Sequence, residues 1–317
     1  MARGTGLPGA VVQRSLADWP VVLAAWLLLV CATTLLATGV VYGDAVAGGG
    51  LHRALLAAPP AERTLEVGLS TEIDRLDRLD GAVRPEIARA MAATGGDVVR
   101  VLRSGSFADP AIPADDVHDL TLFTSVDGLE ARMVLSAGAW PVPGTSPLQA
   151  TLSDAAAREM GLAVGDRLDL VSRLDPDLTT SAVISGIWVV EPGDPLWLGD
   201  PLTTTGTTTG GTYTTRGPLM IAEADLLALG GGRGRVDVSW RGLPAIGALR
   251  VDGVDALRAG ANDLAARLRG VVPASTSPRV TTGLPALLDD VGRSVLVSRS
   301  GVILLTIQFA VLAGYAV

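Results

Sequence analysis

Residues 152–170 read LSDAAAREMGLAVGDRLDL and contain the signals for a helix, a turn and a strand in one short run. Ser153 is a favourable helix N-cap, and Asp154 places a negative charge in the first turn, where the helix dipole favours it. Gly161 is expected to end the helix, and Gly165 to turn the chain into a strand. The stretch therefore predicts α and β structure in close alternation.

More strands are predicted around this stretch. The strand at 167–172 is expected to pair with 181–190 (SAVISGIWVV). The Thr/Gly run at 203–215 is of low complexity and predicts a mobile loop. Together these patterns predict a β-rich region over about 119–217.

A β-hairpin is predicted upstream of the same stretch. The runs at 120–125 and 130–136 have strand composition and are separated by the residues Val-Asp-Gly-Leu. Asp-Gly is a favoured hairpin turn, so the two runs are expected to pair with each other.

Two regions of mixed α/β pattern flank the β-rich region. In 63–105, the run at 63–70 (RTLEVGLS) alternates like a strand, and Ser70 can cap a following helix. Pro85 is expected to kink or split that helix, and 98–102 (VVRVL) predicts a second strand. In 218–283 the pattern predicts strands at 219–222, 236–240 and 248–251, and helices at 223–229 and 254–269.

Long apolar segments bracket these regions. Residues 21–42 (VVLAAWLLLVCATTLLATGVVY) contain no charge, and as a helix they would be roughly 33 Å long, enough to cross a bilayer. Residues 302–317 (VILLTIQFAVLAGYAV) would reach roughly 24 Å. The amphipathic run at 284–301 leads into this second segment. It predicts a stalk helix that enters a second, truncated membrane helix.

The first apolar segment can be interpreted as a membrane helix or as a signal peptide. Ala45-Val46-Ala47 resembles a cleavage site, but the apolar core exceeds the roughly 7–15 residues of a signal peptide. We therefore expect an uncleaved helix at 21–42. Arg3 and Arg14 place residues 1–20 in the cytoplasm by the positive-inside rule, so residues 43–283 would be extracytoplasmic.

Composition excludes several functions. All 25 basic residues are arginine, so the chain lacks the lysine that a P-loop needs to bind nucleotide phosphates. The only cysteine, Cys31, cannot form an intrachain disulfide. The formal net charge of −8 argues against nucleic acid as a partner.

The run GLAVGDRLDL at 161–170, preceded by its short helix, resembles the extracytoplasmic core domain of MacB/FtsX-like ABC transporter permeases. The run EPGDPLW at 191–197 is also similar to the large permeases of this group. The order of one N-terminal membrane helix, a long outer domain, a stalk and a second membrane helix fits as well. The chain departs from the family pattern by stopping within the second apolar segment, which implies that it is C-terminally incomplete.

The resemblance implies a permease subunit in the bacterial plasma membrane. Such proteins dimerise, as homo- or heterodimers, and work with a separate cytoplasmic ABC ATPase. ATP-driven motion of the stalks moves the outer domain, which has a β-α-β porter-like part and a β-rich insertion. The implied fold class is α+β: a membrane helix, an extracytoplasmic α/β domain with an inserted β-rich subdomain, and a stalk. No cofactor is implied, and membrane lipid is an expected partner.

Other functions stay open. A two-helix, membrane-anchored binding or sensor protein without an ATPase would have the same layout. Further membrane helices beyond Val317 and a neighbouring ATPase gene would favour the permease. A membrane-tethered hydrolase is disfavoured, because no Gly-x-Ser-x-Gly motif is present and no serine is placed beside His52 or His118. We therefore expect a protein without a catalytic site.

One acidic loop holds the densest set of possible metal ligands. Asp115, Asp116 and His118 are the candidates, since carboxylate and imidazole groups can bind divalent cations. Pro110 and Pro113 mark this segment as a surface loop, where acidic side chains are normally solvated. We expect no metal site there.

Further side chains are expected to be structural. Trp188, Trp197 and Trp240 lie in or near strand patterns and are expected to be core residues rather than the lining of a lipid or peptide groove. Asp289 and Asp290 with Arg293 are expected to form ion pairs on the surface of the stalk.

Overall fold

The computed structural model describes residues 48–293 except 192, 198, 233 and 274–276, together with Trp19, Leu23, Trp26, Leu27, Val30, Thr33, Thr34, Ala37, Thr38 and Gln308. Residues 54–289 form one compact unit, and the remaining residues on both sides form another. Most residues of the predicted membrane helices at 21–42 and 302–317 lie outside the described residues. Within the described residues, no helix is both long enough and apolar enough to span a bilayer.

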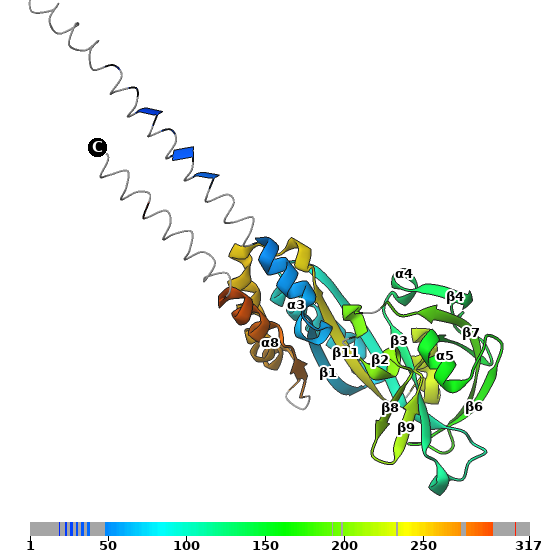
Figure 1. Ribbon diagram of the computed structural model, residues 1–317. Coiled ribbons are helices and arrows are strands. Elements are labelled where there is room, and N and C mark those ends of the chain that lie inside the picture. Colours follow the sequence, from blue (N-terminus) through cyan, green and yellow to red (C-terminus); the bar gives the residue numbers. More distant parts are fainter. Residues whose placement is uncertain are drawn as a thin grey trace, which may run out of the picture. The chain divides into compact units, whose positions relative to one another are not determined.

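The unit at 54–289 is α+β, and its first part consists of two interleaved β-α-β motifs (Figure 1). Strand β11 (Arg235–Pro244) lies between β1 (Leu65–Glu72) and β2 (Gly96–Ala108) and is antiparallel to both. Strand β12 (Arg279–Thr281) pairs with the other edge of β1. The strand order β12-β1-β11-β2 with two helices is that of ferredoxin-like domains. The elements are β1 (Leu65–Glu72), α3 (Leu76–Ala90), β2 (Gly96–Ala108), β11 (Arg235–Pro244), α8 (Val254–Val271) and β12 (Arg279–Thr281).

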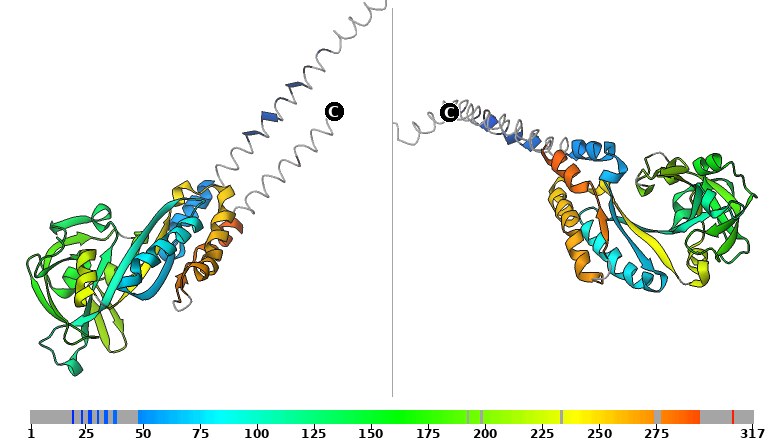
Figure 2. Two further views of the ribbon diagram at one scale, coloured as in Figure 1. Left: turned by 180° about the vertical axis from the view of Figure 1, so that it is seen from behind. Right: turned by 90° about the horizontal axis from the view of Figure 1, so that it is seen from below.

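Helices α3 and α8 cover the same face of this four-stranded sheet (Figure 2). The buried residues of α3 recur at helical spacing: Leu76, Leu79, Val83 and Ile87. The helices approach closely at Gly260, where an added Cβ would lie 2.4 Å from the carbonyl oxygen of Ala90. We call residues 65–103 and 235–281 the ferredoxin-like lobe.

The second part, residues 104–234, is inserted between β2 and β11, and we call it the barrel lobe. The outer end of β2 pairs with β3 on one side and β6 on the other. The pairing continues through β7, β5 and β10 back to β3, so the strands close into a ring. Inside the lobe, Phe107 and Phe123 pack edge to face with ring centroids 5.0 Å apart. The ring strands after β2 are β3 (Asp119–Val126), β5 (Leu148–Ser153), β6 (Arg167–Ser172), β7 (Thr179–Val189) and β10 (Leu219–Met220).

Short elements complete the barrel lobe. Strand β4 pairs with β7, and the β8–β9 hairpin lies beside β3. These elements are α4 (Leu129–Arg132), β4 (Val134–Gly138), α5 (Asp154–Met160), α6 (Pro201–Thr204), β8 (Thr207–Gly210), β9 (Tyr213–Arg216) and α7 (Glu223–Ala228).

The predictions for residues 152–190 are confirmed. Ser153 caps α5, its hydroxyl accepting a hydrogen bond from the Ala156 amide at 3.1 Å. Gly161 ends the helix with φ 66°. Strand β6 has the predicted bounds and pairs antiparallel with β7.

The prediction that a helix follows Ser70 directly is wrong. Strand β1 continues to Glu72, because Thr71 and Glu72 still have partners in β11, and a 3₁₀ turn then precedes α3. Pro85 does not split α3, which is continuous through it and is packed along its buried face.

Three further local predictions are also wrong, two in the barrel lobe and one in the ferredoxin-like lobe. Residues 120–125 and 130–136 do not form a hairpin: β3 joins β2 and β10, while β4 joins β7. The Thr/Gly run holds α6 and the β8–β9 hairpin, since threonine favours strands. Residues 248–251 contribute to two 3₁₀ turns rather than a strand, whereas the helix predicted at 254–269 is confirmed as α8.

The chain enters and leaves the unit at 54–289 on neighbouring strands. Strand β12 pairs antiparallel with the start of β1, with Val280 opposite Val67. Just beyond this pairing, the Thr282 hydroxyl donates to the Thr64 carbonyl at 2.7 Å. Residues 284–293 are helical, as expected for the start of the stalk; residues 294–301 lie outside the described residues.

Candidate functional site

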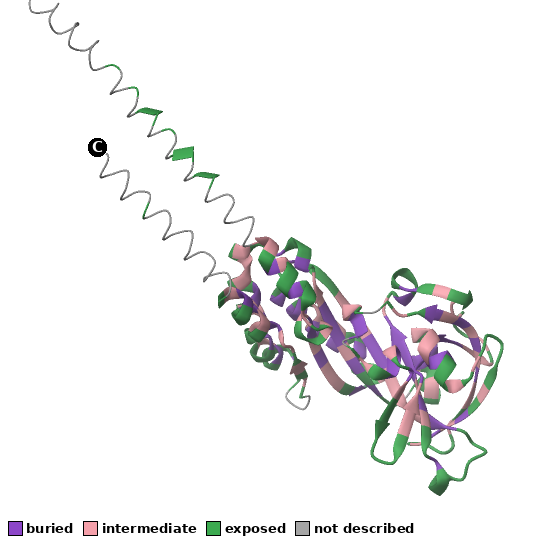
Figure 3. Ribbon diagram, viewed as in Figure 1, coloured by how far each residue is buried: buried purple, intermediate pink, exposed green. Residues whose placement is uncertain are grey.

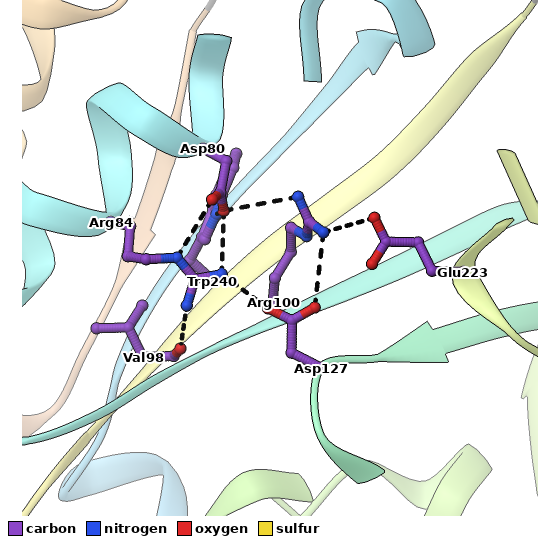
Figure 4. A network of polar contacts seen from close by, with 7 residues as sticks. All are labelled: Asp80, Arg84, Val98, Arg100, Asp127, Glu223 and Trp240. Atoms are coloured by element: carbon purple, nitrogen blue, oxygen red, sulfur yellow. Dashed lines mark hydrogen bonds and ion pairs between the residues drawn. The ribbon is translucent and has the colours of Figure 1, made fainter. Parts of the chain in front are cut away.

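A network of charged side chains joins the two lobes on one face of β2, and we call it the charged junction (Figure 4). Arg100 of β2 lies at its centre. It connects residues of α3 and β11 in the ferredoxin-like lobe with residues of the barrel lobe. The members are Asp80, Arg84, Arg100, Asp127, Glu223 and Trp240.

Asp80 anchors the network on α3. Its carboxylate accepts a hydrogen bond from Trp240 Nε1 at 2.6 Å. It also accepts two from Arg84, from Nε and Nη2, each at 3.2 Å. A carboxylate held by a two-pronged guanidinium contact and an indole N–H has a fixed orientation.

Arg84 crosses from α3 to the barrel lobe. Its Nη2 donates to Asp127 Oδ2 at 2.7 Å, and its Nη1 donates to the Val98 carbonyl at 2.6 Å. Asp127 directly follows β3, so this side chain links the first helix of one lobe to a strand end of the other.

Arg100 makes the deepest connection, with a side chain only 11% exposed. Its Nη2 donates to Glu223 Oε1 at 2.6 Å and lies 3.6 Å from Asp127 Oδ1, while Nη1 lies 3.8 Å from Asp80 Oδ1. Glu223 occupies the first turn of α7, where the helix dipole favours a negative charge. Arg100 therefore contacts three carboxylates carried by three different elements.

The network shifts the pKa values of two of its members, Asp80 and Arg84. Burial of the Asp80 carboxyl would raise its pKa, but the hydrogen bonds from Trp240 and Arg84 and the charges of Arg84 and Arg100 outweigh burial and lower it. Burial likewise opposes the charged form of Arg84, but its contacts with Asp80 and Asp127 raise its pKa. Asp80 and Arg84 are therefore both charged at neutral pH, which preserves the contacts between them.

The opposite face of β2 joins the same lobes through apolar side chains, which we call the apolar junction. Val99 and Val101 of β2 pack there with Trp188 and Trp197, whose rings stack with centroids 5.3 Å apart. Figure 3 shows buried residues gathering where β2 and β3 run between the lobes. The other members are Val126, Leu129, Met133, Leu196 and Met220.

No protein-family model matches this chain, and no curated protein was found to match it.

The candidate metal ligands do not gather. Asp115 and Asp116 lie exposed in a 3₁₀ turn (Ala114–Asp116), and His118 is exposed two residues further on. Among the described residues, no three His, Cys, Asp or Glu side chains come together in a way that could hold a metal ion. The Thr214 amide donates a hydrogen bond to the His118 carbonyl, which holds the backbone of His118 beside β9.

The predictions for the tryptophans and the stalk carboxylates can be compared directly with the structure. Trp188, Trp197 and Trp240 are at most 1% exposed, which confirms them as core residues. Asp290 pairs with Arg293 as expected. Asp289 pairs instead with Arg258 of α8 at 2.6 Å.

The charged junction was not predicted from the sequence. Asp80 and Arg84 have the spacing of a helical ion pair, which is an ordinary surface pattern. Arg100 interrupts the apolar run VVRVL, and this isolated charge in a strand was the available signal. Its partners could not be found, because Glu223 lies 123 residues away in the chain.

The charged junction has a structural role, because its contacts connect the two lobes. Each of its carboxylates contacts a guanidinium, and Trp240 adds a neutral donor. Together with the apolar junction it fixes β2 relative to both lobes.

Proposed function

We propose that the protein is a permease subunit of a bacterial ABC transporter of the MacB/FtsX-like type. In this proposal, residues 21–42 and 302–317 cross the plasma membrane, 284–301 form the stalk, and the unit at 54–289 lies outside. A separate cytoplasmic ATPase and a second permease subunit would complete the machine. ATP hydrolysis would move the outer unit for export or envelope remodelling.

The observation that carries the proposal is the position of the two chain ends of the unit. β1 and β12 are neighbouring strands, and the Thr282–Thr64 hydrogen bond lies where the chain enters and leaves. Gly283 fits against Glu62, whose Cα would lie 2.9 Å from a Cβ added at position 283. The two chain segments that lead toward residues 42 and 302 therefore leave the unit at 54–289 from neighbouring strands.

The internal organisation supports the same proposal. The β-rich insertion between β2 and β11 agrees with the porter-like part and inserted part that the resemblance implies. The two junctions on β2 join these parts on both faces. Such a unit suits the transmission of movement from the stalk to the outer end.

The test is whether an ATPase accompanies the chain. We would tag it at its chromosomal locus, purify it from membranes in mild detergent, and measure ATP hydrolysis. These 317 residues contain no lysine and therefore no P-loop, so mass spectrometry of the preparation would establish which polypeptide carries the ATPase site. An untagged strain purified in parallel is the control.

We expect a co-purifying ATPase subunit, and hydrolysis that disappears when the P-loop lysine of that subunit is replaced. If the chain is recovered intact after cross-linking in membranes without any nucleotide-binding subunit, the permease proposal fails. The membrane-anchored binding protein would then be the better interpretation.

A further inference from the structure

The face of the ferredoxin-like sheet opposite α3 and α8 bears a polar cleft of about 580 Å³. Because side chains alternate along a strand, every second residue of the four strands points to this face. Arginines, carboxylates and hydroxyls contribute most of the lining. The polar residues are Glu66, Ser70, Arg103, Asp237, Ser239, Arg241, Ser277, Arg279 and Thr281.

Arg241 is the deepest of these side chains and is only 3% exposed. Its Nη1 donates to the Leu196 carbonyl, while its Nε lies 3.8 Å from Glu66 Oε1, beyond hydrogen-bond reach. Among the described residues, Nε has no hydrogen-bond acceptor. A buried guanidinium N–H without an acceptor is costly, so the positive charge of Arg241 is incompletely compensated by the described residues around it.

Arg103 lines the same cleft and shares this property. One of its terminal nitrogens pairs with Asp200, but its buried Nε also lacks a hydrogen-bond acceptor among the described residues. Burial first, and then the charge of Arg103, lower the pKa of Arg241 to about 10. The two guanidinium groups therefore repel each other, and Arg241 remains charged at neutral pH.

The cleft is rich in charged side chains. Its lining contains the three arginines Arg103, Arg241 and Arg279 and the two carboxylates Glu66 and Asp237, and the carboxylate of Asp200 pairs with Arg103 beside them. Ser239 and Thr281 add hydroxyl groups that can donate or accept. Apolar side chains are a minority of the lining, which disfavours a lipid tail.

We propose that this cleft binds a small polar molecule through one anionic group, a carboxylate or a phosphate, held between Arg103 and Arg241. The planar guanidinium matches both groups, and an anion there would relieve the repulsion between the arginines. Hydroxyl or amino groups on the rest of the molecule would meet Ser239, Thr281 and Asp237. The site is independent of the proposed permease function, since binding needs no ATPase.

The experiment is calorimetric titration of the full chain in detergent micelles with two probes, inorganic phosphate and L-glutamate, at ionic strength fixed with chloride. We expect saturable binding of at least one probe. Arg103→Gln should weaken it about tenfold or more, because it removes one arm of the site. Arg167→Gln is the matched control: this arginine lines a different cleft with Asp169 and Ser181.

The two probes separate the sources of the anion. Binding of phosphate alone assigns a phosphoryl ligand, and binding of glutamate alone assigns a carboxylate. If Arg103→Gln changes the circular dichroism spectrum, Arg279→Gln replaces it, since Arg279 is exposed and its loss should also weaken binding. No heat from either probe, or equal weakening by Arg167→Gln, would overturn the site.

Discussion

The two faces of β2 join the same pair of lobes by opposite means. On one face Val99 and Val101 meet two stacked tryptophans, and every member of the apolar junction is at most 8% exposed. On the other face Arg100 meets three carboxylates that keep between 22% and 35% of their side-chain exposure. One junction excludes water, and the other stays within its reach.

This difference assigns different roles to the two junctions. Burial of large apolar side chains supplies most of the free energy that holds folded lobes together. Ion pairs offset much of their attraction by losing hydration, but their geometry is specific. We therefore expect the apolar junction to set how strongly the lobes adhere and the charged junction to set how they are oriented.

The largest effect is expected at the apolar junction. Trp197→Ala removes a fully buried ring and its stacking with Trp188, and should lower the free energy of unfolding by about 3–5 kcal/mol. Trp197→Phe should cost far less, because the indole Nε1 has no hydrogen-bond partner among the described residues. Chemical denaturation of the full chain in micelles measures both. Equal losses for the two variants would refute the packing argument.

A smaller loss is expected at the centre of the charged junction. Arg100→Met keeps the volume but leaves Glu223 and Asp127 without this partner, which should cost about 2 kcal/mol. Adding Glu223→Gln should restore part of the loss, since the unpaired charge is gone. Denaturation of the single and double variants forms a double-mutant cycle. Strict additivity would contradict a direct Arg100–Glu223 interaction.

Acidification should lower the stability contributed by the charged junction and leave that of the apolar junction unchanged. The pKa of Asp80 is lowered in the folded state, so its contribution is present above its unfolded value, near 3.8, and is lost as pH falls through the folded value. Thermal unfolding followed between about pH 6 and pH 3 should show a fall in stability that is shallower in Asp80→Asn. The Trp197→Phe variant should keep the slope of the unmodified chain. An unchanged slope in Asp80→Asn would contradict the charged state assigned to Asp80.

The smallest effect is expected for an ion pair outside both junctions. Arg158 of α5 pairs with Asp154 at 2.9 Å, and its side chain is 71% exposed. Arg158→Ala should change the free energy of unfolding by no more than about 0.5 kcal/mol. A loss as large as that of Arg100→Met would mean that burial does not distinguish these ion pairs.

How far the sequence predicted this molecule depended on the distance between interacting residues. Residues 152–172 could be interpreted correctly because the cap at Ser153, the left-handed Gly161 and strand β6 are local signals. The ring of the barrel lobe could not be predicted, since it closes by pairing β2 with both β3 and β6, and β6 is distant from β2 in the sequence. The same holds for Trp240 and Asp80, which bond across 160 residues. The Asp-Gly pair predicted a hairpin of β3 and β4, but β3 pairs with β2 and β10, and β4 pairs with β7.

In the permease proposal, the two joined lobes lie outside the membrane and are attached to it at both ends. Single-cysteine labelling tests it most directly, because Cys31→Ala leaves the chain without a thiol. Asp115→Cys in the exposed acidic loop and Ser15→Cys near the N-terminus would be probed with a membrane-impermeant maleimide. We predict that Asp115→Cys is labelled in intact spheroplasts and Ser15→Cys only after lysis. Labelling of Asp115→Cys only after lysis would contradict the account.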